Sequence, residues 1–216
     1  MFNTTRSIPP PTSLLRQTRY DSEDVYDALN IVFHSKCYLC ETKEPHDVNV
    51  EHFDPHLGDN NKKFDWNNLY LSCGRCNNIK LAGHTNLLDC CDSRQDVFRA
   101  IKHLPAPTPY AKRVQVIAVS KDVKTEETQK LLEKIYNSEH TVNKKVSGAF
   151  LRKKIFDQYN LLLDQVNSFY SPTATDLEKE VAISKIKVLT DSSAPYSAFM
   201  RWCILEDEKL CMLLEL

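Results

Sequence analysis

The sequence predicts an α+β protein that is mostly helical and contains a small zinc-stapled finger. The 216 residues are 42% hydrophobic and 26% charged, which is an ordinary globular composition. Glycine occurs only four times, so helix should dominate and flexible linkers should be few. Two Cys-x-x-Cys pairs, Cys37/Cys40 and Cys73/Cys76, indicate the finger.

The chain is expected to start with an extended arm over residues 1–21. Three consecutive prolines, Pro9 to Pro11, forbid a helix there and favour polyproline II. A helix should follow over residues 22–35, because apolar residues recur along one of its faces and Ser22 is suited to cap its first turn.

Residues 36–84 contain the elements of the predicted finger. Apolar and polar residues alternate from Val48 to Phe53, which is typical of a short strand. The segment Asp65 to Leu71 suits a turn that leads into a second strand, and Cys76 to Leu81 suits the start of a helix. Together with its flanking helices, the finger is predicted to form a domain over residues 22–104.

The second half of the chain is predicted to be a mainly helical region over residues 105–216. A helix is expected over residues 92–104, and the proline-rich run Pro105 to Pro109 then marks a module boundary. Val114 to Val119 is expected to form a buried strand. From Thr125 onward, hydrophobic residues recur at helical spacing to the end of the chain.

The two cysteine pairs are expected to bind one zinc ion. Each Cys-x-x-Cys turn presents two thiolates to one ion, and two such turns complete a tetrahedron. Four cysteines leave no open position, so the site should be structural and its binding energy should be folding energy. Four unrelated thiols or a redox pair are the alternatives, although a redox pair needs only one such turn. The expected ligands are Cys37, Cys40, Cys73 and Cys76.

Polar residues in and beside the finger suit the hydrolysis of a phosphodiester bond. Glu51 and His52 lie between the cysteine pairs, and Asn77 directly follows the second pair. The reaction needs a base for water and a cation that neutralises charge on the phosphate. A neutral imidazole suits the first task, and a carboxylate with an amide oxygen suits Mg²⁺ for the second.

The order Cys-x-x-Cys, Glu-His, Asn-Leu, Cys-x-x-Cys-Asn-x-x-Lys resembles the HNH endonuclease family, also called the ββα-metal finger. The resemblance implies two strands and one helix around a single catalytic metal, with His52 as the general base. It implies Glu51 and Asn77 as ligands of a catalytic Mg²⁺ or Mn²⁺, in addition to the structural zinc. It implies Asn68 as the residue that braces the loop behind the base, with Asn67 as the alternative.

Basic residues near the finger are expected to contact the phosphate backbone of a substrate. Lys80 would lie one turn along the finger helix, and Arg75 lies within the second cysteine pair. Lys62 and Lys63 lie in the loop between the finger strands. Asp54 and His56, beside the Glu-His pair, are interpreted as loop residues. A further group of basic residues is interpreted as a solvated helix face: Lys144, Lys145, Arg152, Lys153 and Lys154.

Flanking segments resemble one subgroup of the family, the PtuB-like HNH nucleases of Septu and retron anti-phage defence systems. The segments that carry this likeness, together with the block Glu51–Phe53 of the finger, are Ile8–Leu14, Asn86–Cys90 and Ala194–Trp202. The subgroup implies a PtuA-like ABC-type ATPase as partner, and in retron systems also a reverse transcriptase with its RNA–DNA hybrid. The helical region would then dock the partner or clamp nucleic acid, unless it simply packs on the finger.

Charge and hydropathy restrict these roles. A net charge of −1 excludes a uniformly basic surface, so a nucleic acid must meet local basic groups or be selected by a partner. The sequence has no apolar signal segment and no membrane-spanning run, which predicts a cytoplasmic protein without membrane contact. The expected substrate is DNA or a structured RNA such as tRNA. The alternative is a non-catalytic zinc-stabilised module that binds nucleic acid or protein.

Overall fold

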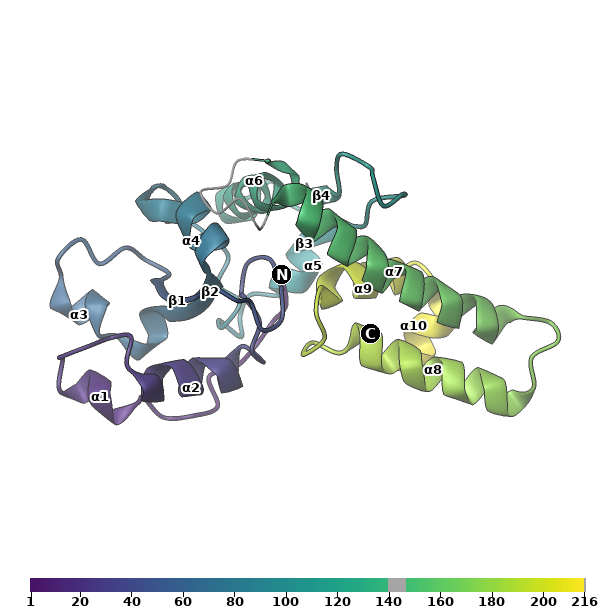
Figure 1. The fold of residues 1–216 in the computed structure, drawn as a ribbon, viewed down its shortest axis with the longest axis horizontal. Coiled ribbons are helices and arrows are strands. Elements are labelled where there is room, and N and C mark those ends of the chain that lie inside the picture. The colour runs from purple at the N-terminus through teal and green to yellow at the C-terminus, as the bar shows by residue number, and fades with distance from the viewer. Residues whose placement is uncertain (140–146, 216) are drawn as a thin grey trace.

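The protein has an α+β fold, drawn as a ribbon in Figure 1 from the computed structural model. The structure describes residues 1–139 and 147–215. About half of these described residues are helical, and they form two small antiparallel sheets. The predicted α+β class is therefore confirmed. Among the described residues, no helix combines the length and the hydropathy that a membrane crossing requires.

The elements follow the chain in an order that puts both sheets before the long helices. The first helices are α1 (Thr12–Leu15), α2 (Glu23–Val32), α3 (Asn60–Lys63), the 3-10 helix η1 (Trp66–Asn68), α4 (Gly74–Lys80), the 3-10 helix η2 (Leu81–Gly83) and α5 (Val97–Ala100). The strands are β1 (Val48–His52), β2 (Leu69–Cys73), β3 (Ile101–Leu104) and β4 (Gln115–Ala118). The later helices are α6 (Val123–Asn137), α7 (Gly148–Tyr170), α8 (Asp176–Thr190), α9 (Ser197–Ile204) and α10 (Glu208–Leu214).

The finger forms from β1, β2 and α4, as the sequence predicted. β1 pairs with β2 in antiparallel register, with Glu51 opposite Tyr70 and His52 opposite Leu69. All five residues of β2 are buried, and α4 begins directly where the strand ends. The Sγ atom of Cys73 accepts a hydrogen bond from the backbone N–H of Cys76 at 3.5 Å, so a predicted zinc ligand also caps the helix.

Residues 92–104 differ from the predicted helix. Only α5 is helical, and the chain then continues as β3, which pairs in antiparallel register with β4. Val97 and Phe98 lie in this single helical turn and are buried. From Ile101 onward, buried and half-buried residues alternate, as in a strand. The proline-rich run that starts at Pro105 therefore lies in the connection between two paired strands. The strand predicted as buried is found at β4, but burial alternates with exposure along it.

The later helices pack on the finger and on the second sheet. α6 contacts α4 and β4, and α9 contacts β3. α7 and α8 form a helical hairpin that extends away from the finger (Figure 1). The start of α8 is a capping box, in which Thr175 and Glu178 satisfy each other's backbone N–H groups. Buried apolar side chains from both halves of the chain form one cluster.

The predicted extended arm packs against the body and contains α1. Met1 and Phe2 are buried, and the guanidinium of Arg6 lies over the rings of Trp66 and Tyr70, at 4.9 and 4.8 Å from their centroids. The arm therefore contributes apolar surface to the core and a cation to the aromatic residues beneath it.

A buried ion pair joins the first cysteine turn to the last part of the chain. The Nζ atom of Lys36 lies 3.3 Å from Oε2 of Glu41, and both side chains are fully buried. The N-terminal amine of Met1 lies 3.3 Å from Oε1 of the same carboxylate. Ser197 donates its hydroxyl to Oε2 of Glu41 at 2.9 Å, and Lys36 donates to the carbonyl of Ala194 at 3.0 Å. These bonds satisfy charges that would otherwise be costly to bury.

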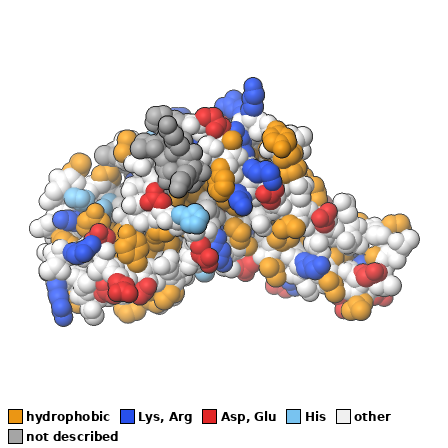
Figure 2. Space-filling model, viewed as in Figure 1, with side chains coloured by type: hydrophobic (Ala, Val, Ile, Leu, Met, Phe, Trp, Pro, Cys, Tyr) orange, Lys and Arg blue, Asp and Glu red, His pale blue; other side chains and the backbone are white. Residues whose placement is uncertain are grey.

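Charged residues on the surface are mixed rather than separated. Basic and acidic side chains lie interspersed over the face in Figure 2, in keeping with the net charge of −1. The basic group predicted as a solvated helix face is found only in part. Arg152 is buried and donates to the carbonyl of Tyr136, whereas Lys153 is exposed and pairs with Asp157. Lys144 and Lys145 lie outside the described residues.

Candidate metal centre and active site

Four cysteines come together as the sequence predicted. Cys37 and Cys40 lie in the turn after α2, Cys73 ends β2, and Cys76 lies in α4. All four are buried, and their sulfur atoms lie within 4.8 Å of one another. The sulfurs of Cys40 and Cys73 are 3.8 Å apart, which matches the separation of about 3.8 Å in a tetrahedron with Zn–S bonds of about 2.3 Å. The cluster can hold a structural metal such as zinc.

The environment of these thiols favours a bound cation. Burial raises the pKa of the Cys76 thiol well above its ordinary value, and its hydrogen bond with Cys37 raises it further. A cation at the centre of the cluster would remove this penalty, because it supplies the counter-charge that buried thiolates lack. The donor set and its spacing therefore fit zinc.

His52 lies at the end of β1 with its ring half-buried. Its Nε2 atom is 3.0 Å from the backbone carbonyl of Lys63. A carbonyl only accepts hydrogen bonds, so Nε2 carries the hydrogen and Nδ1 is the basic atom. Within the described part of the chain, Nδ1 has no hydrogen-bond partner. Burial lowers the pKa of His52, so the neutral ring is favoured at neutral pH.

Asn68 holds the loop that follows His52. Its Oδ1 atom accepts from the N–H of Asp54 at 2.7 Å, and its Nδ2 atom donates to the carbonyls of Asp54 and Lys62 at 2.8 and 3.0 Å. The loop is thus closed at both ends, and its far end is next to the carbonyl that orients His52. Asn67 is exposed, so of the two asparagines Asn68 is the one in the bracing position.

Glu51 does not fit a divalent ion in this arrangement. Its side chain is only 6% exposed, its Oε1 atom lies 2.6 Å from Nζ of Lys80, and its Oε2 atom accepts from the Tyr38 hydroxyl at 2.6 Å. Burial raises the pKa of Glu51, and the Lys80 ammonium opposes that rise. A metal ion on Oε1 would lie against the ammonium charge. Asn77 is half-buried one turn before Lys80, on the same face of α4.

Lys80 and Arg75, the predicted phosphate contacts, are both buried and bonded to groups of the protein itself. Lys80 is 1% exposed and also donates to the carbonyl of His52 at 3.1 Å. Arg75 is 4% exposed and donates to the carbonyls of Ile135 and Ser138 at 2.5 and 2.9 Å. Arg75 therefore binds the end of α6, because the last carbonyls of a helix lack partners within the helix. The predicted substrate contacts are corrected to structural contacts in this arrangement.

Tyr20 and His56, which the sequence did not single out as site residues, lie around His52, together with the predicted phosphate contacts Lys62 and Lys63. The rings of Tyr20 and His56 lie edge-on to it, with centroids at 4.7 and 4.6 Å. Lys62 is exposed and pairs with Asp54 at 2.6 Å, and half-buried Lys63 supplies the carbonyl that orients His52. Tyr20 comes from the arm, so no spacing within the finger could have predicted it. His56 follows His52 closely, which was the available signal.

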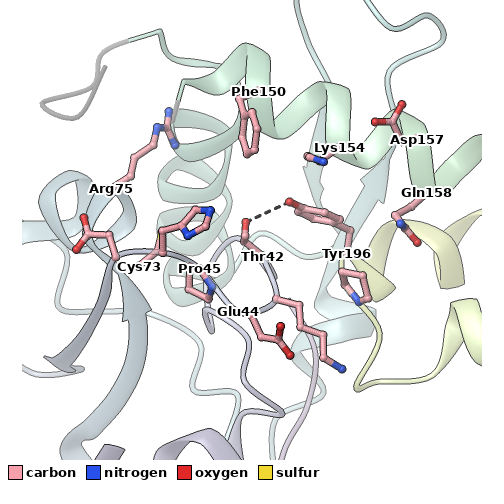
Figure 3. A pocket seen from close by; sticks show the side chains of 15 residues that line it. Thr42, Glu44, Pro45, Cys73, Arg75, Phe150, Lys154, Asp157, Gln158 and Tyr196 are labelled. Atoms are coloured by element: carbon pink, nitrogen blue, oxygen red, sulfur yellow. Dashed lines mark hydrogen bonds between the residues drawn. The ribbon is translucent and has the colours of Figure 1, made fainter. Parts of the chain in front are cut away.

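A cavity of about 890 Å³ lies on a different part of the finger (Figure 3). The first cysteine turn and its continuation form one wall, including Thr42 and Pro45, and α7 forms the other with Phe150 and Lys154. Thr42 and Tyr196 are joined across one end by a hydrogen bond of 3.2 Å. None of the residues predicted to be catalytic lines this cavity, whereas Arg75, which was predicted to bind substrate, does.

Comparison with known proteins gives no further assignment. No family model matches the chain, and no curated protein and no solved structure matches it significantly.

Proposed function

We propose that the protein is a nuclease that hydrolyses phosphodiester bonds of DNA or structured RNA, with His52 as general base. The orientation of the His52 ring supports this proposal most directly. A backbone carbonyl fixes Nε2–H, and the basic Nδ1 atom is left without a partner among the described residues. A base must be neutral and unpaired to take a proton from water, and the lowered pKa of His52 favours that state.

Neighbouring residues support this role by fixing the position of the base. Asn68 closes the loop behind His52, and Lys80 holds the backbone of the same residue through its carbonyl. Lys62 and Lys63 are the basic side chains of that loop, and they would neutralise charge on a phosphate better than the buried Lys80 and Arg75.

The resemblance to the HNH family implies a catalytic divalent ion. The ion pair between Glu51 and Lys80 does not support Glu51 as a ligand of that ion. Dependence on Mg²⁺ or Mn²⁺ is therefore part of the test. The further proposal of a defence effector with a PtuA-like ATPase, and with a reverse transcriptase and its RNA–DNA hybrid, rests on the resemblance of short segments alone.

The rate at which the His52→Ala variant cleaves nucleic acid tests whether His52 is the general base. The wild-type protein and the variants are each incubated with plasmid DNA and with total RNA, with and without Mg²⁺ or Mn²⁺. His46→Ala is the matched control, because His46 is exposed at the cavity of Figure 3, away from the proposed base. We expect His52→Ala to lower the rate about 10²–10⁴-fold and His46→Ala to leave it unchanged.

Two outcomes would contradict the proposal. Equal rates for His52→Ala and wild type would show that His52 is not the base. No cleavage under any condition, with nucleic-acid binding that is lost only when Cys37 is replaced, would favour the zinc-stabilised binding module. The pH profile gives an independent check, because the rate should rise with pH through a pKa below the ordinary 6.5 of histidine.

A further inference from the structure

A second group of sulfur and oxygen atoms lies in the turn after η2, apart from the four-cysteine centre. The ligand atoms of Asp89, Cys90 and Cys91 lie within 4.8 Å of one another. Cys90 is buried, and Cys91 is partly exposed. None of these residues takes part in the proposed hydrolysis, so the group calls for a separate explanation.

The backbone and β2 hold this turn in place. Oδ1 of Asp89 accepts from the N–H of Cys91 at 2.7 Å and from the Tyr70 hydroxyl at 2.5 Å. The carbonyl of Cys90 accepts from the N–H of Thr4 in the N-terminal arm at 2.9 Å. Contacts from two other segments, β2 and the N-terminal arm, therefore fix the turn that carries the two thiols.

A guanidinium with free donors lies beside these thiols. Arg6 stacks on the ring of Tyr70, and its Nε and Nη1 atoms are buried without a hydrogen-bond partner in the described structure. The hydrogen bond with Cys90 lowers the pKa of Cys91, and the charge of Arg6 lowers it further. Burial raises the pKa of Cys90. Of the two thiols, Cys91 therefore loses its proton more readily than Cys90.

The same surroundings argue against a metal ion at this place. The Arg6 cation would repel a second cation, and three consecutive residues cannot surround an ion from several sides. A partly exposed thiol beside a guanidinium and a second thiol is instead the arrangement of a reactive cysteine with its resolving partner.

We propose that Cys90 and Cys91 are a redox-active thiol pair whose substrate class is a peroxide. The Cys91 thiolate attacks one oxygen of hydrogen peroxide, the O–O bond breaks, and the departing hydroxide takes a proton to become water. Cys91 is then a sulfenic acid. The Cys90 sulfur attacks the Cys91 sulfur, the S–O bond breaks, and a second water leaves with the Cys90 proton. Two thiols lose two electrons in total, and one peroxide gains them.

Disulfide formation between adjacent residues would reshape the turn. Consecutive Cα atoms are about 3.8 Å apart, below the 4.4–6.8 Å usual for a disulfide. The turn must therefore rearrange, which disturbs the bond between Asp89 and Tyr70. Tyr70 lies opposite Glu51 in the finger sheet, so oxidation would be transmitted to the strand that carries His52.

The test treats the zinc-loaded full chain with one equivalent of hydrogen peroxide and follows each cysteine by peptide mass spectrometry. Cys203 is the internal control, because burial raises its pKa to about 12. We expect the peptide with Cys90 and Cys91 to lose two hydrogens before Cys203 reacts, while zinc stays bound. In Cys90→Ser, a sulfenic acid should accumulate at Cys91 and be trapped by dimedone.

Variants of Arg6 test the role of the cation. Arg6→Met should slow oxidation about tenfold, which corresponds to about one unit in the pKa of Cys91, and Arg6→Lys should restore most of the rate. Oxidation of Cys203 at the same rate as Cys91, or absence of any dimedone adduct in Cys90→Ser, would overturn the proposal. Neither readout depends on nuclease activity, so this proposal stands or falls separately from the proposed function.

Discussion

Replacing Lys80 with methionine tests whether its ion pair with Glu51 is part of the fold. The two charged groups are 2.6 Å apart, and their side chains are 0% and 6% exposed. Methionine keeps a similar length but removes the charge, which leaves the carboxylate buried with the Tyr38 hydroxyl as its remaining hydrogen-bond donor. Removal of one partner from a buried pair costs about 3–5 kcal/mol, so we expect a loss of that size in the free energy of unfolding at pH 7.

Urea denaturation of the zinc-loaded protein, followed by far-UV circular dichroism, measures the loss. The double variant Glu51→Gln with Lys80→Met is the matched control, because it removes both charges and leaves a neutral side chain beside Tyr38. It should recover most of the stability that the single variant loses, since neutral groups carry a smaller desolvation penalty.

The loss should also depend on pH. Burial already raises the pKa of Glu51, and removal of Lys80 raises it further. A carboxyl group whose pKa is higher in the folded state destabilises the fold when it ionises. The free energy of unfolding therefore falls as pH rises from the unfolded pKa of about 4.3 through the folded pKa. The defect of Lys80→Met should therefore be large at pH 7 and shrink toward pH 4. A loss below about 1 kcal/mol at pH 7, or an equal loss at both pH values, would refute the reasoning.

Three further results are expected. Arg75→Met should lower the melting temperature, because each hydrogen bond lost to the carbonyls of Ile135 and Ser138 costs about 1.5–3 kcal/mol of stability. Weaker nucleic-acid binding at an unchanged melting temperature would instead support the predicted substrate contact. Burial raises the pKa of Glu41, but the charges of Lys36 and the N-terminal amine lower it to about 2. The free energy of unfolding should therefore fall by about 3 kcal/mol as pH falls from 4.5 to 2. Glu41→Gln should flatten that part of an acid titration. Chelation of the structural metal should melt the β1–β2 sheet, because such zinc sites contribute about 10–16 kcal/mol; a sheet signal that survives complete zinc release, measured with an indicator dye, would contradict this.

Local patterns were sufficient to predict the finger. The spacing of the cysteines, the alternation from Val48 to Phe53 and the helix that starts near Cys76 all depend on neighbours in the chain. The cluster of four sulfurs follows from these local elements. Asn68 lies at the predicted bracing position for the same reason, because it directly precedes β2.

Partners that are distant in the sequence were not predictable. Arg75 and Lys80 look like free basic residues on a finger helix, and nothing near them indicates that Ser138 or Glu51 will bind them. The helix expected over residues 92–104 failed for a related reason, because the apolar spacing fits one helical face and only the pairing with β4 selects a strand. Long-range hydrogen bonds decided these cases.

The buried pair of Lys36 and Glu41 has a practical consequence for dissecting the protein by deletion. Ser197 and the carbonyl of Ala194 supply bonds to this pair, so a fragment limited to residues 22–104 would bring two charges into an apolar interior without their distant partners. Such a fragment should misfold even though it includes all four cysteines of the cluster. Loss of activity after C-terminal truncation would then report a collapsed finger, and it would be wrongly read as proof that the removed helices bind a partner.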